Sequence, residues 1–418
     1  MKRSFADILQ DLDGERARKL ARKLPEWAAA GVEIPSALSL EQCSSSATAS
    51  YKAVLAISAP RSGELPPKTS CCAGPLPLPS EAGPSLLRSR GWLRFSEAVA
   101  ADVPPERTEL KLVLDLTCGL GVDSWALSKV AERVVSYERD AVLCEAARRN
   151  FARLGADNIE VRCETVTPET DLPEADLIFA DPARRDAAGR KVFLLEDCTP
   201  DILTLLPMLQ KKAPAVLLKL SPMADLTMLA QRLGSALREI HVVESDGEVK
   251  ELLCLLLRDN TPAEPEITVV TLASHNGRLH FRMAEEREAE AVFAAGVQPG
   301  GVLLEPCPAL LKAGAFNLPC ARWGLQKLAA FTHLYTGTLS EEAAPWFKAR
   351  KIREVLPFGS ASFKQIKHRY PRAELTARNL PLGSAELQKK MGLSPGGDAH
   401  IFACRLADGS AVLIVCGD

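Results

Sequence analysis

Residues 112–123 combine an apolar stretch, a glycine-punctuated turn and the start of a helix. From Asp115 to Asp123 the chain reads Asp-x-Thr-x-Gly-x-Gly-x-Asp. Glycines at such a turn let the backbone approach a ligand where a Cβ would collide. A carboxylate at the strand end, such as that of Asp115, can accept hydrogen bonds from an ammonium group or from amides. The pattern predicts a site for a nucleotide cofactor.

Carboxylates also follow the next two expected strands. Glu138 comes after residues 134–137, about twenty residues past the first turn, where a carboxylate can bind both hydroxyls of a ribose. Glu164 comes after residues 159–163, where a polar side chain can face an adenine amine. The Gly-x-Gly-x-x-Gly spacing of a dinucleotide site is missing, which favours S-adenosylmethionine over NAD. The predicted cofactor-binding residues are Asp115, Thr117, Gly119, Gly121, Asp123, Glu138, Arg139 and Glu164.

A second motif follows the apolar residues 177–180 and contains the predicted catalytic residues, which are Asp181, Pro182 and Arg184. A rigid Asp-Pro turn can hold a carboxylate against an amine nucleophile and accept its proton during methyl transfer. Methyltransferases that modify an amine of a flipped base often have an aromatic residue at this point, which stacks on the base. Here Ala183 and Arg184 occupy these positions, so that residue is missing. Arg184 and Arg185 can instead hold phosphate or carboxylate groups. Cys198 beside Glu196 is an alternative nucleophile for pyrimidine methylation.

Strand and helix patterns alternate between residues 110 and 258, which predicts parallel strands joined by crossover helices. We therefore expect an α/β, Rossmann-like, doubly wound sheet. Residues 240–243 and 252–257, joined by a Ser-Asp-Gly turn, predict an antiparallel hairpin at one sheet edge. The start of the chain predicts a small helical cap, and a Pro, Gly and Ser-rich stretch follows it. After residue 265 the pattern predicts an α+β appendage.

Composition limits the class of protein. The 418 residues are 47% hydrophobic and 25% charged, which is ordinary for a soluble globular chain. The first twenty residues lack the apolar run of a signal peptide, and no apolar stretch is long enough to cross a bilayer, so we expect a cytoplasmic protein with no membrane segment. Twelve scattered cysteines without a Cys-x-x-Cys pair indicate reduced thiols. Six well-separated histidines give no metal-ligand spacing, so we expect no metal site.

Positive charge is concentrated near the carboxyl end. Residues 300–418 contain 15 Lys and Arg against 9 Asp and Glu, a balance of +6, whereas the whole chain carries −2. A domain that binds phosphate groups needs such a balance.

These motifs together resemble the bacterial class I S-adenosylmethionine-dependent methyltransferases with a carboxyl-terminal THUMP-like domain. The similarity covers residues 40–53, 115–123, 181–190, 195–200 and 219–223, and in the last third Glu305-Pro306, residues 311–316, 333–336, Arg378-Asn379 and 396–398. Cys118 departs from the family, which has glycine there. The resemblance implies a seven-stranded methyltransferase sheet, S-adenosylmethionine as cofactor and, by analogy, RNA as partner. It also implies the following division: a helical cap at 1–57, a linker or insertion at 58–90, the methyltransferase domain at 91–260, a small ferredoxin-like unit at 261–298 and the THUMP-like domain at 299–418.

Three functions remain open at this point. The first is a methyltransferase that acts on tRNA or rRNA, with the basic region binding phosphates. The second is a methyltransferase for an amine of a protein or small molecule, in which Arg184 and Arg185 would bind a substrate carboxylate. The third is a non-catalytic protein that keeps the cofactor fold for binding alone. The sequence does not define an oligomeric state.

Overall fold

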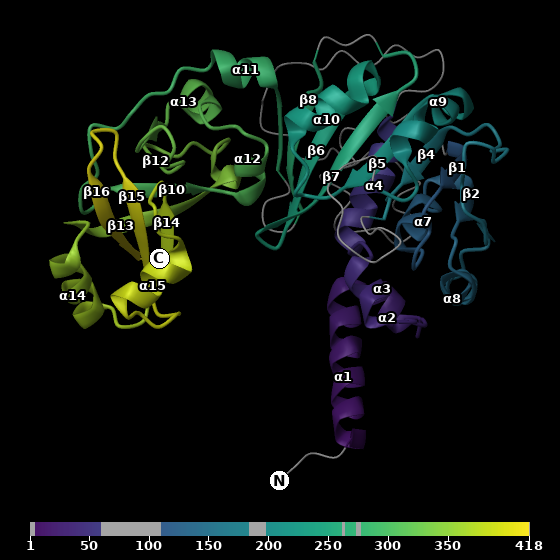
Figure 1. Cartoon of the computed structure of the whole chain (residues 1–418), viewed down its shortest axis with the longest axis horizontal. Helices are drawn as coiled ribbons and strands as arrows, with labels where there is room; N and C mark the ends of the chain where they lie inside the picture. The colour runs from purple at the N-terminus through teal and green to yellow at the C-terminus, as the bar shows by residue number, and fades with distance from the viewer. Residues whose placement is uncertain (1–4, 60–109, 184–197, 261–263, 273–276, 418) are drawn as a thin grey trace. The chain divides into compact units, whose positions relative to one another are not determined.

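The structure is a computed structural model that describes residues 5–59, 110–183, 198–260, 264–272 and 277–417, with side chains from residue 14 onward. The chain forms two compact units (Figure 1). Unit 1 comprises Met1–Asp246 and Lys250–Asn276, and unit 2 comprises Gly247–Val249 and Gly277–Asp418. The Pro-rich stretch of the sequence and residues 184–197, which include Arg184 and Arg185, lie outside the described residues.

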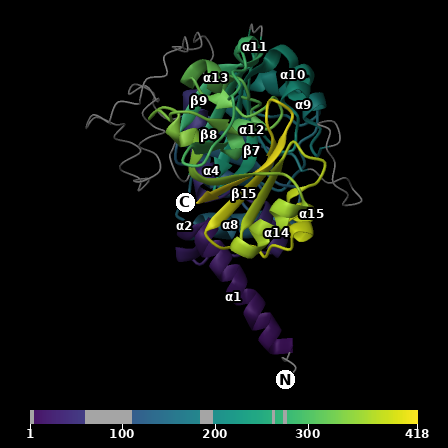
Figure 2. The same cartoon turned by 90° about the vertical axis from the view of Figure 1, so that its left-hand side faces the viewer.

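Helices make up the start of unit 1: α1 (Phe5–Lys23), α2 (Pro25–Ala29), α3 (Ala37–Gln42) and α4 (Ser46–Ser58). Reciprocal capping boxes begin α3 and α4, where Ser36 and Ser45 each accept a hydrogen bond from the third amide of the helix. Helix α1 extends away from the sheet of unit 1 (Figures 1 and 2). In contrast, α4 is buried from Thr48 to Ile57 except at Ser50. It packs against α7 (Val122–Leu127), so this part of the cap belongs to the core of the unit.

The strands of unit 1 form one sheet in the order β3-β2-β1-β4-β5-β7-β6-β8. Neighbours among the first five strands of that order run parallel, and β7 runs antiparallel to β5. Strands β4 and β5 are almost fully buried apolar runs, as expected for parallel strands covered on both faces. The bounds are β1 (Leu110–Asp115), β2 (Ala131–Tyr137), β3 (Ile159–Arg162), β4 (Leu177–Ala180), β5 (Ala215–Leu220), β6 (Leu237–Ser245), β7 (Glu248–Leu257) and β8 (Glu266–Thr271).

The crossover helices are α7, α8 (Ala141–Arg153), α9 (Ile202–Lys212) and α10 (Leu226–Leu233), with a short η2 (Gly234–Ala236) after α10. Helix α9 is capped by Asp201, whose carboxylate accepts hydrogen bonds from the amides of Leu203 and Thr204. Thr199 is held in an extended bridge with Ala183, which keeps it out of the helix.

The β6–β7 hairpin does not lie at the sheet edge, contrary to the sequence-based expectation. Strand β7 is inserted beside β5, and β8 pairs in parallel with β6 over Glu239–Glu244. All six residues of β8 are buried, Glu266 and two threonines among them, so this strand from beyond residue 265 is an integral part of the sheet. The order β3-β2-β1-β4-β5-β7-β6 supplies the seven expected strands, and β8 extends them.

Unit 2 contains a second sheet in the order β11-β12-β10-β13-β16-β15-β14. Helices α14 and α15 cover one face, where Ile366 and Leu387 pack on Leu375, Ile401 and Leu413 (Figure 2). The elements are β9 (Arg278–Arg282), α11 (Met283–Glu288), β10 (Val302–Pro306), α12 (Pro308–Lys312), α13 (Leu318–Trp323), β11 (Gln326–Lys327), β12 (Tyr335–Thr336), η3 (Ala344–Trp346), β13 (Phe347–Pro357), α14 (Ser360–Arg369), β14 (Glu374–Arg378), α15 (Ser384–Met391), β15 (Ala399–Arg405) and β16 (Ala411–Gly417). None of the described helices has the length and hydropathy needed to cross a membrane.

Candidate functional site

Asp115 lies at the carboxyl end of β1 and is completely buried. Its Oδ1 accepts a hydrogen bond from the amide of Thr117 at 2.9 Å, and its Oδ2 accepts one from the Ser124 hydroxyl at 2.5 Å. Burial raises the pKa of this carboxyl from 3.8 to about 7, against the opposing effect of those two hydrogen bonds. Asp115 therefore fixes the path of the turn between β1 and α7.

The two glycines of the turn have different reasons to be glycine. Both have positive φ, +55° at Gly119 and +95° at Gly121. A Cβ on Gly121 would lie 2.5 Å from Cζ of Phe151 in α8, so packing within the protein already excludes a side chain there. A Cβ on Gly119 would meet nothing closer than 3.9 Å. The open space at Gly119 fits close approach of a ligand to the backbone.

Glu138 follows β2 and reaches the same turn. Its Oε2 accepts the amide hydrogen bond of Gly119 at 2.7 Å, and its Oε1 accepts that of Asp140 at 2.9 Å. The side chain is half-buried, so it remains open to a ligand. Arg139 and Glu164 are exposed at the ends of β2 and β3. The structure thus brings Glu138 to the glycine turn, whereas no hydrogen bond links Arg139 or Glu164 to that turn within the described residues.

Cys118, the departure from the family pattern, points into the protein. Its residue is 5% exposed, and its Sγ accepts a hydrogen bond from Ser124 Oγ at 3.7 Å. Burial raises the pKa of the thiol well above its usual value, so the sulfur stays protonated. The thiol is directed toward Ser124, and its presence is compatible with an open turn.

Asp181 follows β4 and is tied to the cofactor turn. Its amide donates a hydrogen bond to Thr117 Oγ1 at 2.7 Å. Its carboxylate Oδ2 accepts one from Nζ of Lys219, at the end of β5, at 2.5 Å. Pro182 is buried directly after it. Because β4 pairs with β1, Asp181 and the glycine turn are neighbours at adjacent strand ends.

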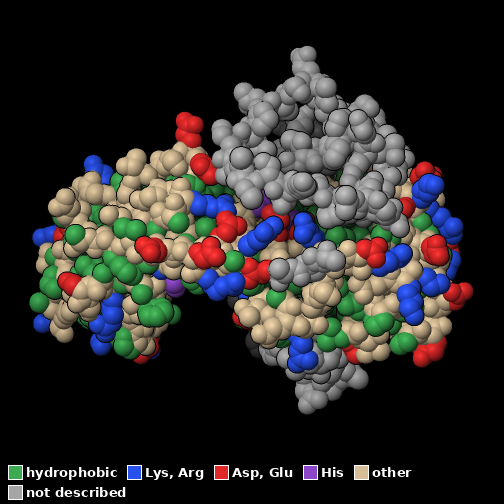
Figure 3. Space-filling model, turned by 90° about the horizontal axis from the view of Figure 1, so that it is seen from above, with side chains coloured by type: hydrophobic (Ala, Val, Ile, Leu, Met, Phe, Trp, Pro, Cys, Tyr) green, Lys and Arg blue, Asp and Glu red, His purple; other side chains and the backbone are tan. Residues whose placement is uncertain are grey.

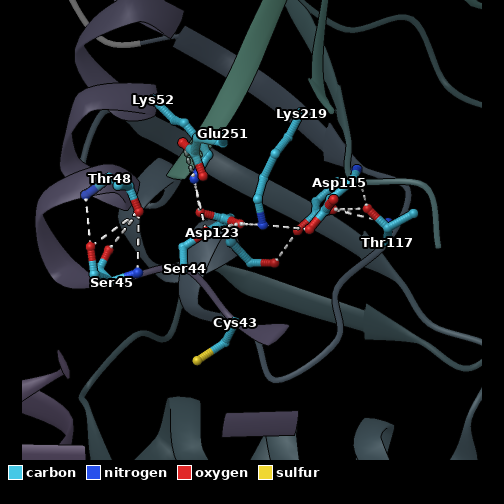
Figure 4. A network of polar contacts seen from close by, with 12 residues as sticks. Cys43, Ser44, Ser45, Thr48, Lys52, Asp115, Thr117, Asp123, Lys219 and Glu251 are labelled. Carbon is cyan, nitrogen blue, oxygen red and sulfur yellow. Dashed lines mark hydrogen bonds and ion pairs between the residues drawn. The ribbon is translucent and has the colours of Figure 1, made fainter. Parts of the chain in front are cut away.

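Asp123 belongs to a buried ion-pair network (Figure 4), where the sequence had suggested a cofactor contact. Nζ of Lys52, from α4, donates to Asp123 Oδ1 at 2.9 Å and to Ser44 Oγ at 2.8 Å. The Ser44 hydroxyl donates in turn to Asp123 Oδ2. Glu251 of β7 lies 2.9 Å from the same ammonium group, and Lys219 lies 3.8 Å from Asp123. Lys52 is completely buried, so its charge is balanced only within this network.

Charge pairing offsets burial differently across the network. Burial alone would lower the pKa of Lys219, but the carboxylates of Asp181, Asp123 and Glu251 raise it above its ordinary value. Burial would raise the pKa of Asp123, yet Lys52 and Lys219 lower it overall. At Glu251 burial prevails, and its pKa is raised. Lys219 and Asp123 are consequently held ionised beside Asp181.

Neither Lys52 nor Glu251 has a role that was predicted from the sequence. The one local signal was a lysine within the apolar run from Tyr51 to Ile57 of an otherwise buried helix. A lysine is almost never fully buried without a partner, so this position indicated an internal carboxylate. Among the residues that the structure describes, no His, Cys, Asp and Glu side chains form a group that could hold a metal ion.

A doubly wound parallel sheet with a reversed β7, a glycine turn after β1 and an acidic residue after β2 defines the class I methyltransferase fold. The open space at Gly119 and the carboxylate of Glu138 fit an S-adenosylmethionine nucleoside. Comparison with known proteins agrees with this class. A crystal structure of a protein from Porphyromonas gingivalis W83, proposed to be a methyltransferase, is 31% identical and has a TM-score of 0.74, covering 97% of this chain and 88% of that one.

Two curated relatives are uncharacterised S-adenosylmethionine-dependent methyltransferases of Mycobacterium tuberculosis, from strains H37Rv and CDC 1551. Each is 26% identical over 332 residues, which is 76% of this chain and 86% of the relative. Family models for a ferredoxin-like domain and a THUMP domain-like region match residues 303–343 and 348–418. The chain belongs to the class I S-adenosylmethionine-dependent methyltransferases with a carboxyl-terminal THUMP-like domain, and its cofactor is S-adenosylmethionine.

The ferredoxin-like match does not coincide with the segment chosen from the sequence. The sequence analysis placed that unit at 261–298, which the structure divides between unit 1 and unit 2 after Asn276. The family model places it at 303–343, around β10 and β12.

Proposed function

We propose that this methyltransferase modifies a nucleoside of RNA, with tRNA or rRNA as the substrate class. The observation that carries the proposal is the charge of the THUMP-like segment. Residues 348–418 contain 12 Lys and Arg against 6 Asp and Glu, in a chain whose net charge is −2. A polyanion binds such a segment through its phosphates and releases counterions.

Much of this charge lies on the helix layer of unit 2. Lys364 and Lys367 of α14 and Lys389 and Lys390 of α15 are exposed. Within the described residues, none of these four ammonium groups pairs with a carboxylate. By contrast, the face displayed in Figure 3 mixes acidic, basic and apolar side chains. Because their four lysines are exposed, helices α14 and α15 are the elements that we expect to contact RNA phosphates.

The chemistry proposed for unit 1 is transfer to an amine nitrogen. The cofactor supplies an electrophilic methyl group on a sulfonium when it is bound. The new nitrogen–carbon bond forms as the sulfur–carbon bond breaks, and the bond electrons leave with sulfur as a thioether. The amine must lose a proton, and Asp181 is the proposed acceptor because its backbone amide is bonded to Thr117, which holds this acidic residue next to the glycine turn.

Neighbouring residues would position Asp181 for this role. Lys219 donates to one of its carboxylate oxygens, Oδ2, and no donor among the described residues binds the other, Oδ1, which is therefore open to the incoming amine. The buried ring of Pro182 restricts the backbone after it. Arg184 lies outside the described residues, and we retain it as a proposed contact to a substrate phosphate.

Mass spectrometry of nucleosides tests the proposal. RNA from cells with the gene, without it, and complemented with Asp181→Asn is digested and compared. We expect one methylated nucleoside to be missing from the deletion and from the Asp181→Asn strain, because loss of a general base typically costs about 10²–10⁴-fold in rate.

Asp201→Asn is the matched control, since Asn also caps a helix and should preserve α9 and the modification. An identical nucleoside profile in all strains would contradict RNA as substrate. In that case purified enzyme that still methylates a peptide or small amine would identify the alternative substrate class.

A further inference from the structure

Unit 2 contains a charged cluster on the side of its sheet opposite the helix layer. Glu305 of β10 lies 3.4 Å from Arg350 of β13 and 3.9 Å from Arg378 at the end of β14. Three strands separate β10 from β14 in the sheet order, so the sheet must curve to bring Glu305 and Arg378 together. The guanidinium of Arg350 also lies 5.7 Å from the centre of the Phe402 ring.

Two buried nitrogen atoms of the cluster, Nε of Arg378 and Nδ1 of His333, have no hydrogen-bond partner among the described residues. The positive charge of Lys327 lies close enough to His333 to lower the pKa of its imidazole. Nζ of Lys327 donates a hydrogen bond to the neutral Oδ1 of Asn317 at 2.8 Å. A buried donor without an acceptor costs free energy, so an absent ligand is a physical explanation for this arrangement.

The backbone is unusual at the same place. Outside glycine, the described residues with positive φ are Asp246, His333 and Asn379. Asp246 belongs to the β6–β7 turn, but the other two flank this cluster, since Asn379 directly follows Arg378. Left-handed backbone at a non-glycine residue is unfavourable and concentrates at binding sites.

The electrostatic balance favours an anion. His333 is stacked on Phe316 with ring centres 4.0 Å apart. Burial, followed by the positive charges of Lys327 and Arg378, lowers the pKa of His333 to about 4. Among the described residues, Arg378 pairs with one carboxylate, that of Glu305, which also pairs with Arg350. Glu286 acts on Lys327 by its charge without forming an ion pair with it.

We propose that Arg378, His333 and Lys327 form a phosphate-binding site within unit 2. A planar guanidinium suits the oxygens of a phosphate, the ammonium group of Lys327 supplies a further positive charge, and the neutral imidazole of His333 can donate its one N–H. An adjacent anion also favours the protonated form of His333, so phosphate binding should raise its pKa. The phosphate can belong to a free mononucleotide or to an RNA, and only the second source rests on the proposed function.

Calorimetry and NMR on the full chain test the site. Inorganic phosphate, AMP, and a short RNA with either a 5′-phosphate or a 5′-hydroxyl are titrated at constant ionic strength. We expect phosphate to bind and to raise the pKa of His333 by about 1 or more, followed by its imidazole resonances. His333→Asn assigns those resonances, since Asn tolerates left-handed backbone.

Arg378→Gln should weaken phosphate binding about tenfold or more, whereas Arg405→Gln, an exposed arginine of the same unit, should leave it unchanged. If Arg378→Gln does not fold, Arg378→Lys takes its place. The titration of His333 in the wild type then shows whether phosphate binds at the site. No phosphate-dependent change at His333, or equal binding by the two arginine variants, would overturn the proposal. If phosphate binds but the enzyme methylates no RNA, the phosphate site is supported and only the proposed function is refuted.

Discussion

Asp115 and Glu138 both accept hydrogen bonds from the glycine turn, yet their surroundings differ. Asp115 is fully buried, and each of its oxygens has a donor within the protein. Glu138 is half-buried and accepts only from backbone amides at the rim of the turn. At the residue scale we therefore propose that Asp115 shapes the turn and that Glu138 binds the cofactor.

Glu138→Gln should weaken S-adenosylmethionine binding about tenfold, because a charge-assisted acceptor for the ribose hydroxyls becomes a neutral amide. Calorimetry with S-adenosylmethionine measures the change. The matched control is Glu160→Gln, since Glu160 is an exposed carboxylate on β3 that pairs with Arg133 and Arg162. Equal affinity of the two variants would remove Glu138 from the cofactor site.

Asp115 should make stability depend on pH. Its folded-state pKa, about 7, is above its ordinary value of 3.8, so the folded protein holds this proton more tightly than the unfolded chain. The associated stability is complete below about pH 3.8 and is lost as pH rises through 7.

Urea unfolding of the wild type and of Asp115→Asn at pH 5 and pH 8 measures this effect. The wild type should lose more stability between the two values than the variant does, by about 2 kcal/mol. A constant difference between the two proteins at both pH values would contradict the assignment.

The residues of the cofactor turn and Asp181 could be placed from the sequence because each follows an apolar strand directly. Position at a strand end is a local property, and parallel strands then bring their ends to one edge. Lys52 and Glu251 could not be paired in this way. About 200 residues separate them, and only the folded core determines that they meet.

At the scale of elements, α4 links the start of the chain to the chemical site. Its apolar side chains join the core of unit 1, and burial of each large one contributes roughly 1.5–3 kcal/mol. Its lysine reaches Asp123 and Glu251. The helix therefore belongs to the catalytic unit, and the sequence-based picture of a separate cap is too simple.

Lys52→Met should destabilise unit 1 by about 3–5 kcal/mol, because it leaves two buried carboxylates without their cation. Lys19→Met is the comparison, since Lys19 pairs with Glu41 at an exposed position where loss costs at most about 1 kcal/mol. Denaturant unfolding measures both. Adding Asp123→Asn and Glu251→Gln to Lys52→Met should recover part of the loss. Similar costs for the two lysine variants would show that the buried network contributes little.

The strands of unit 1 were predictable because buried parallel strands are short apolar runs bounded by turns. The position of β8 in the sheet could not be predicted from the sequence. Its pattern identifies a strand, but the sequence after residue 265 changes character, and nothing local indicates that β8 pairs with β6. The ferredoxin-like segment was misplaced for the same reason, since β8 was counted with the elements that follow it.

At the scale of the whole molecule, net charge and local charge have opposite signs. The chain carries −2, but its THUMP-like segment carries an excess of six positive charges. Long-range attraction to RNA is therefore expected to depend on that segment and to weaken with salt.

Replacing Lys364, Lys367, Lys389 and Lys390 with Gln should reduce RNA affinity and flatten its dependence on salt. Each lost phosphate contact lowers the slope of log affinity against log salt by about 0.7 for single-stranded RNA. Fluorescence anisotropy at several salt concentrations measures the slope. Lys111→Gln with Lys211→Gln, two exposed lysines of unit 1, is the control. An unchanged slope in the fourfold variant would place the RNA contacts elsewhere.

The pairing of Lys52 with Glu251 also bears on how the protein is made. The ribosome completes α4 before any strand of the sheet, and β7 follows about 200 residues later. At about 5–20 residues per second, roughly 10–40 s pass between the two. Until α7 is made, the nascent helix lacks its apolar partner helix and the carboxylate of Asp123, and until β7 is made its lysine lacks the carboxylate of Glu251. We expect it to be a segment that ribosome-bound chaperones hold until translation passes residue 257.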